Sequence, residues 1–86
     1  MDEGKIVIIP TYNEIENIEN IIRKVFSLDG EYHILVIDDG SPDGTADTVK
    51  ALQKEFPSKL FLLERSGKQG LGTAYLTGFR WALDHG

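Results

Sequence analysis

Three short apolar runs alternate with three amphipathic segments along the chain. The runs cover residues 5–9, 33–37 and 60–63, and β-branched or aliphatic residues dominate each of them. Continuous runs of this length are typical of strands that are buried on both faces of a parallel sheet. The segments between them repeat apolar residues at helical spacing. The pattern predicts a single α/β domain in the order βαβαβα, a Rossmann-like parallel sheet with right-handed crossovers.

Turn-forming residues set the expected limits of these elements. Pro10 is expected to end the first strand because proline cannot donate to a sheet ladder, and Asn13 is a suitable cap for the first helix. The second helix is expected to begin near Thr45 or Ala46. A glycine in mid-helix costs about 1 kcal/mol relative to alanine, so Gly78 predicts that the third helix packs closely on the sheet.

Composition narrows the class of protein. The chain has 86 residues and a net charge of −5, which argues against a nucleic-acid partner, since binding of that kind needs a basic face. It has no cysteine, so a disulfide framework is excluded. No apolar run approaches the roughly 20 residues of a membrane span, and no signal peptide is recognisable. These features predict a cytoplasmic protein.

Two adjacent carboxylates, Asp38 and Asp39, follow the second apolar run directly. Ligands of open α/β sheets bind beyond the carboxyl ends of the strands. Ionised carboxylates accept hydrogen bonds from sugar hydroxyls and base N–H groups, or bind a metal. Because two neighbouring acids repel each other, we expect a ligand or cation to compensate this pair. Ser41 and Asp43 are instead expected to make ordinary turn hydrogen bonds.

Polar residues also follow the first apolar run. Tyr12 offers a flat ring for a base and a hydroxyl, and Glu14 offers a carboxylate for a ribose or a base edge. Their position after a strand favours a shared crevice with the two aspartates. Position alone leaves a purely structural interpretation equally open.

The glycine-rich segment 65–75 is a weak phosphate signal. The dinucleotide fingerprint fails because its last position is Tyr75, and the phosphate-loop pattern is missing. Arg65 and Lys68 could supply positive charge to a diphosphate, although solvated surface charge is the commoner role of such residues.

Three segments together strongly resemble the family 2 inverting glycosyltransferases. They are Ile-Pro-Thr-Tyr-Asn-Glu at 9–14, Ile-Asp-Asp-Gly-Ser-Pro-Asp-Gly-Thr at 37–45 and Gly-Leu-Gly-Thr-Ala-Tyr at 70–75. The second and third resemble in particular the dolichyl-phosphate (polyprenyl-phosphate) mannosyltransferases. The resemblance implies a glycosyltransferase-A fold, with the chain as its nucleotide-binding part. It also implies a nucleotide-sugar site lined by Pro10, Tyr12, Glu14, Ile37, Asp38 and Asp39.

The same resemblance implies substrates and a cofactor. The donor would be GDP-mannose or a related nucleotide sugar, and the acceptor a dolichyl or polyprenyl phosphate at the cytoplasmic face of a membrane. The family binds Mg²⁺ or Mn²⁺ through an Asp-x-Asp motif, and no such motif occurs in residues 1–86. The metal ligands are therefore expected outside this chain, and the catalytic residues are unknown.

The missing motif leads to two further expectations. Residues 1–86 are expected to be a partial catalytic domain, an amino-terminal fragment that is inactive alone. Without the metal-binding strand beside it, the apolar run Ile6–Ile9 would be an exposed sheet edge, which predicts self-association through that edge.

Two alternatives remain open at the level of sequence. One is a receiver-like signalling module with Asp38 and Asp39 as a Mg²⁺ pocket, although the third run ends in Leu63-Glu64-Arg65 and lacks the expected phospho-acceptor aspartate. The other is a non-catalytic nucleotide-binding domain.

Overall fold

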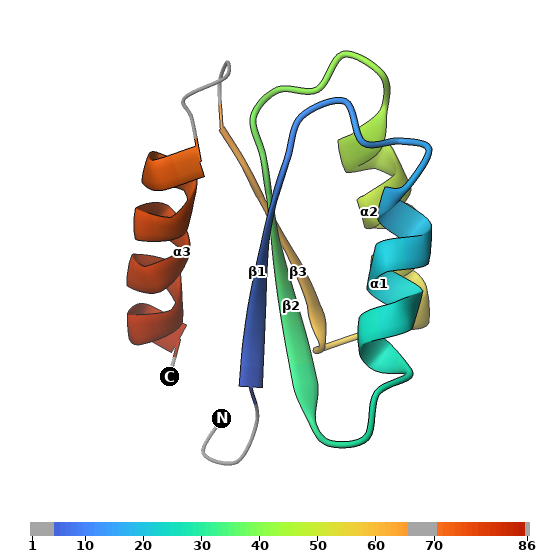
Figure 1. The fold of residues 1–86 in the computed structure, drawn as a ribbon, viewed down its shortest axis with the longest axis vertical. Coiled ribbons are helices and arrows are strands. Elements are labelled where there is room, and N and C mark those ends of the chain that lie inside the picture. The colour runs from blue at the N-terminus through green and yellow to red at the C-terminus, as the bar shows by residue number, and fades with distance from the viewer. Residues whose placement is uncertain (1–4, 66–70, 86) are drawn as a thin grey trace.

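The structure, a computed structural model, describes residues 5–65 and 71–85; for 71–75, 84 and 85 it describes the backbone alone. Strands and helices alternate as the sequence predicts, and the α/β fold class is confirmed. Figure 1 shows two of the helices on one face of the sheet and the third on the other. The elements are β1 (Lys5–Thr11), α1 (Ile18–Phe26), β2 (Tyr32–Asp38), α2 (Thr45–Glu55), β3 (Leu60–Glu64) and α3 (Leu71–His85).

The described strands form one parallel sheet in the order β1-β2-β3. Its register aligns Thr11 with Asp38, and Asp38 with Glu64. All three strands therefore end at the same level, and the loops that follow β1 and β2 lie together at the carboxyl ends of the strands, at the top of Figure 1.

The first strand continues through Pro10 to Thr11, so the predicted end at Pro10 is wrong. The carbonyl of Thr11 accepts a hydrogen bond from the Asp39 amide, 3.1 Å away, and therefore faces β2. Successive residues of a strand point their backbone groups to opposite edges. The nitrogen of Pro10 thus faces the edge of β1 that carries no partner within the described chain, where a missing N–H costs nothing.

The first helix begins at Ile18 and not directly after Asn13, so the predicted cap is wrong. Asn13 has φ of 58°, in the left-handed region, and the backbone makes turns before the helix starts. Asn17 occupies the cap position but makes no capping hydrogen bond through its side chain. The second helix begins at Thr45, as predicted.

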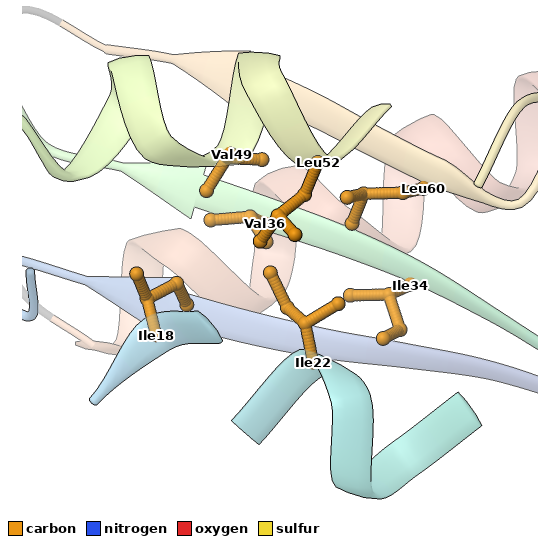
Figure 2. Close-up of a cluster of buried hydrophobic side chains, with 7 residues drawn as sticks. All are labelled: Ile18, Ile22, Ile34, Val36, Val49, Leu52 and Leu60. Carbon is orange, nitrogen blue, oxygen red and sulfur yellow. The ribbon is translucent and has the colours of Figure 1, made fainter. Parts of the chain in front are cut away.

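The main hydrophobic core lies between the sheet and the two helices α1 and α2. Alternate residues of β2 point into it and meet one face of each helix, as Figure 2 shows. None of its fully buried members exposes more than 6% of its surface. They are Ile18, Ile22, Ile34, Val36, Val49, Leu52 and Leu60.

The other face of the sheet is covered by α3. Leu35 and Ile37 are fully buried there, and the ring of Trp81 lies 4.9 Å from that of Phe61. A Cβ atom on Gly78 would come within 2.8 Å of the Ile8 side chain. The prediction that Gly78 permits close packing on the sheet is therefore confirmed. Within the described residues, no helix has both the length and the apolar character that a bilayer crossing requires.

Candidate functional site at the carboxyl ends of the strands

The carboxylate of Asp38 is buried and bound by neighbouring side chains. One oxygen accepts hydrogen bonds from the hydroxyls of Thr11 (2.8 Å) and Ser41 (2.6 Å), and the other accepts from the Ser41 amide (2.9 Å). Asp38 exposes only 2% of its surface. The expectation that this aspartate stays out of turn hydrogen bonding is wrong. Its carboxylate joins the end of β1 to the loop after β2.

Asp39 has a different partner, the guanidinium of Arg65. The Nε and Nη2 atoms of Arg65 donate to the two carboxylate oxygens at 2.6 and 2.9 Å, and both side chains are about 8% exposed. Arg65 directly follows β3, and its Nη1 also donates to the Thr77 hydroxyl of α3 at 3.5 Å. A two-point contact of this kind fixes the plane of the carboxylate as well as its position.

The two aspartates lie on opposite faces of the sheet. Successive side chains of a strand alternate between faces. Ile34 and Val36 belong to the core under α1 and α2, so the side chain of Asp38, two residues further along, lies on the same face. Leu35 and Ile37 belong to the cluster under α3, and Asp39 follows them there. The expected repulsion within a shared pocket is therefore avoided, and the compensating cation for Asp39 comes from the protein itself.

The remaining predicted site residues divide in the same way. Pro10 pairs in register with Ile37 and alternates with Ile6 and Ile8, so these two predicted residues lie with Asp39 on the α3 face. Glu14 lies on the other side, where its amide donates to the Thr45 hydroxyl at the start of α2. Tyr12 lies in the loop after β1 and exposes 38% of its surface. The site is thus split into a set with Asp39 and a set with Asp38.

The described residues do not supply a metal centre. No group of three or more His, Cys, Asp or Glu side chains within residues 5–65 and 71–85 is arranged to hold a metal ion. Both aspartates after β2 already have protein partners. A receiver-like Mg²⁺ pocket at this pair is therefore not supported.

Sequence reasoning missed the partnership of Arg65 with Asp39. It assigned Arg65 a phosphate or a solvated position, whereas the guanidinium is buried against the carboxylate. Two signals were present in the sequence. Asp39 falls in step with Leu35 and Ile37, and Arg65 falls in step with Phe61 and Leu63 on the next parallel strand. Alternation along both strands places the two charges on one face.

A parallel α/β sheet of this kind belongs to a class of folds whose ligands bind beyond the carboxyl ends of the strands. The model of the family "Glycosyl transferase family 2" matches residues 6–84. The chain therefore belongs to glycosyl transferase family 2, and the resemblance seen in the sequence is confirmed.

Two curated relatives agree with this assignment. The chain is 48% identical over 81 residues to polyprenol monophosphomannose synthase of Mycolicibacterium smegmatis, covering 94% of this chain and 31% of that protein. It is 46% identical over 81 residues to undecaprenyl-phosphate mannosyltransferase of Micrococcus luteus, covering 94% of this chain and 33% of that protein. The chain thus spans about a third of the length of these relatives.

A solved structure confirms the fold. The mannosyltransferase PcManGT from Pyrobaculum calidifontis, in complex with GDP-Man and Mn²⁺, superposes with a TM-score of 0.82 at 30% sequence identity. The match covers 91% of this chain and 24% of that one. The predicted glycosyltransferase-A type of α/β fold is confirmed by this likeness.

Proposed function

We propose that the protein carrying this chain transfers mannose from GDP-mannose to a polyprenyl phosphate such as dolichyl phosphate. The observation that carries the proposal is the 48% identity with a polyprenol monophosphomannose synthase across nearly the whole chain. The likeness to a mannosyltransferase bound to GDP-Man supports the choice of donor. In the proposed reaction a phosphate oxygen of the lipid forms a bond to the anomeric carbon. The bond from that carbon to the diphosphate breaks, its electron pair leaves with GDP, and the configuration inverts.

The residues of this chain would bind the nucleoside part of the donor. Asp39 is held in a fixed plane by Arg65, which suits a carboxylate that accepts hydrogen bonds from base N–H groups. Pro10 and Ile37 lie on the same face of the sheet as Asp39, and Tyr12, which exposes 38% of its surface, would supply an aromatic ring for stacking on a base. Glu14 would contribute from the other side of the edge, and Asp38 would act by holding the loops.

The cofactor and the location belong to the same proposal. A divalent cation, Mg²⁺ or Mn²⁺, would neutralise the leaving diphosphate when bound, and its ligands would come from outside the described residues. A polyprenyl acceptor is anchored in a bilayer, so the protein would work at the cytoplasmic face of a membrane. Residues 1–86 would form part of the catalytic domain and would be inactive alone.

A transfer assay on the full-length protein tests the proposal. We expect label from GDP-mannose to pass to polyprenyl phosphate in the presence of Mn²⁺ or Mg²⁺. Asp39→Asn should lower kcat/KM roughly 10- to 100-fold, since a hydrogen bond to a charged group is lost. The matched control is Asp29→Asn, which should leave transfer unchanged. Asp29 is exposed and lies between α1 and β2, far from the carboxyl ends of the strands. GDP binding without transfer to any lipid phosphate would favour the alternative, a non-catalytic nucleotide-binding domain.

We also propose that this 86-residue chain associates with itself through β1. Within the described residues β1 pairs only with β2, so the backbone of the apolar segment Ile6–Ile9 has no strand partner along its other edge. Unpaired strand edges are templates for pairing with another chain. Sedimentation at increasing concentration should show dimers or larger species, and a monomer at millimolar concentration would contradict this proposal.

A further inference from the structure

Two loops at the carboxyl edge are joined by a row of hydrogen bonds. They are the loop between β1 and α1, residues 12–17, and the loop between β2 and α2, residues 39–44, which lie side by side in Figure 1. Three consecutive amides of the first loop donate to three side chains in and just after the second. Asn13 donates to Ser41 Oγ (2.8 Å), Glu14 to Thr45 Oγ1 (3.0 Å) and Ile15 to Asp43 Oδ2 (3.2 Å).

The accepting hydroxyls are themselves oriented by carboxylates. Ser41 donates its hydroxyl proton to Asp38 at 2.6 Å, and Thr45 donates its proton to Asp43 at 2.5 Å. A hydroxyl has a single proton. Since each proton is given to a carboxylate, the oxygen presents its lone pairs to the amides of the first loop. Ser41 and Thr45 therefore act as acceptors toward the first loop and as donors toward the carboxylates.

Asp43 is the charged centre of this row. It also accepts from the Thr45 amide at 3.0 Å, and Thr45 is fully buried. The hydrogen bond from the Thr45 hydroxyl, followed by those from backbone amides, holds the pKa of Asp43 below its ordinary value. The carboxylate is therefore ionised at neutral pH and is a strong acceptor.

These bonds hold a loop conformation that contains one left-handed residue. Asn13 has φ of 58°, in a region that asparagine enters more often than most other non-glycine residues. It stands between Tyr12 and Glu14, the two residues of this loop that are assigned to the donor site. The bonds to Ser41, Asp43 and Thr45 come from residues 28 to 31 positions away, so they act only in the folded protein.

We infer that Ser41, Asp43 and Thr45 are positioning residues for the nucleoside diphosphate part of the donor. They touch no ligand; they set the backbone that presents Tyr12 and Glu14. This inference rests on the proposed function and adds to it. The Ser-Pro-Asp-Gly-Thr sequence after the aspartates is then a clamp on the neighbouring loop, and loss of one hydroxyl weakens nucleotide binding at a distance.

The test compares Thr45→Val with Thr45→Ser in the full-length protein, with GDP as the probe. Valine has nearly the shape of threonine but lacks both the donor to Asp43 and the acceptor for Glu14, whereas serine keeps both. We expect Thr45→Val to raise the Kd for GDP at least tenfold and Thr45→Ser to stay within threefold of the parent. Thr48→Val, the same change one turn further along α2, is the control and should leave the Kd unchanged. A Thr45→Val protein that binds GDP within twofold of the parent would overturn the inference.

A second variant and a second readout keep the result interpretable. If Thr45→Val fails to fold, Ser41→Ala takes its place. This substitution, at a half-buried loop position, removes the acceptor of the Asn13 amide and should also weaken GDP binding. Amide hydrogen exchange tests the clamp without any ligand. In Thr45→Val the Glu14 amide should exchange at least tenfold faster, while amides of β2 keep their rates. Unchanged exchange at Glu14 would refute the clamp, whereas a parent protein that fails to bind GDP would refute the proposed function.

Discussion

Asp38 and Asp39 lie on opposite faces of the sheet and have different kinds of partners. On the face covered by α1 and α2, Asp38 accepts hydrogen bonds from neutral donors at the end of β1 and in the loop after β2. It lies above an aliphatic core to which both helices contribute fully buried side chains. On the face covered by α3, Asp39 is paired with a cation, and several large apolar side chains of that helix are exposed. The exposed side chains on α3 are Leu76, Phe79 and Leu83.

The contrast shows how one short acidic sequence serves two purposes. The strand period of two places consecutive residues on different faces. One carboxylate can therefore tie loops together while the other is available to the ligand side. Under the proposed function, Asp38 on the α1 and α2 face would support the loops, and Asp39 on the α3 face would contact the nucleotide, with Glu14 contributing from the other side.

The largest expected loss of stability comes from comparing two variants, each of which removes a side chain that binds one of the two aspartates. Arg65→Met leaves Asp39 buried without its cation and should lower the free energy of unfolding by about 3–5 kcal/mol. Thr11→Val removes one neutral donor from Asp38 and should cost about 1.5–3 kcal/mol. Urea denaturation of both variants measures the difference.

The double variant Asp39→Asn with Arg65→Met is the control for this comparison. It removes the carboxylate charge that Arg65 balances, so it should be more stable than Arg65→Met alone. Suppose that Arg65→Met and Thr11→Val lower the free energy of unfolding equally and that the double variant is no more stable than Arg65→Met. The claim that Asp39 depends on a cation and Asp38 on neutral donors would then be contradicted.

The next effect compares the same substitution in the two hydrophobic clusters. Ile34→Ala in the core under α1 and α2 should cost about 3–4 kcal/mol, because a fully buried side chain leaves a cavity. Ile8→Ala under α3 should cost roughly half as much, since Ile8 is only partly buried. Thermal or urea unfolding gives both values. A greater loss from Ile8→Ala would place the main support under α3 instead.

The smallest effect concerns pH and the loop clamp. The folded-state pKa of Asp43 lies below its ordinary value of 3.8, so its ionised form stabilises the fold above that value. That contribution is lost as the pH falls through the folded-state pKa. Asp43→Asn should therefore lose less stability between pH 5 and pH 3 than the parent does. Urea midpoints at several pH values test this, with Asp29→Asn as the control, and identical pH profiles for parent and Asp43→Asn would contradict it.

The order of strands and helices could be predicted because it depends on local patterns. The runs at 5–9 and 33–37 are β-branched and continuous, and Ile18 and Ile22 repeat at helical spacing. The start of α1 could not be predicted in this way. Asn13 resembles a cap in sequence, but the loop around it is held by Ser41 and its neighbours, which are distant in the chain.

The residues of the candidate site could be predicted from the sequence, but their arrangement could be predicted only in part. The motifs located Asp38 and Asp39 at the end of a strand, which the structure confirms. Their separation onto two faces follows from alternation along β2, a signal that was present in the sequence. The pairing of Asp39 with Arg65 needed the register between β2 and β3, which a single sequence does not supply.

The most direct test of the proposed nucleotide site is a GDP titration of the isotopically labelled chain followed by NMR, with UDP for comparison. The account predicts that GDP shifts the signals of Tyr12, in the loop after β1, and of Asp39, directly after β2. It predicts no shift at a pocket near the amino-terminal end of β2, which is lined by Phe26, Gly30, Tyr32, Phe56 and Lys59. Shifts confined to that pocket, or no shift of Tyr12 and Asp39 at millimolar GDP, would contradict it.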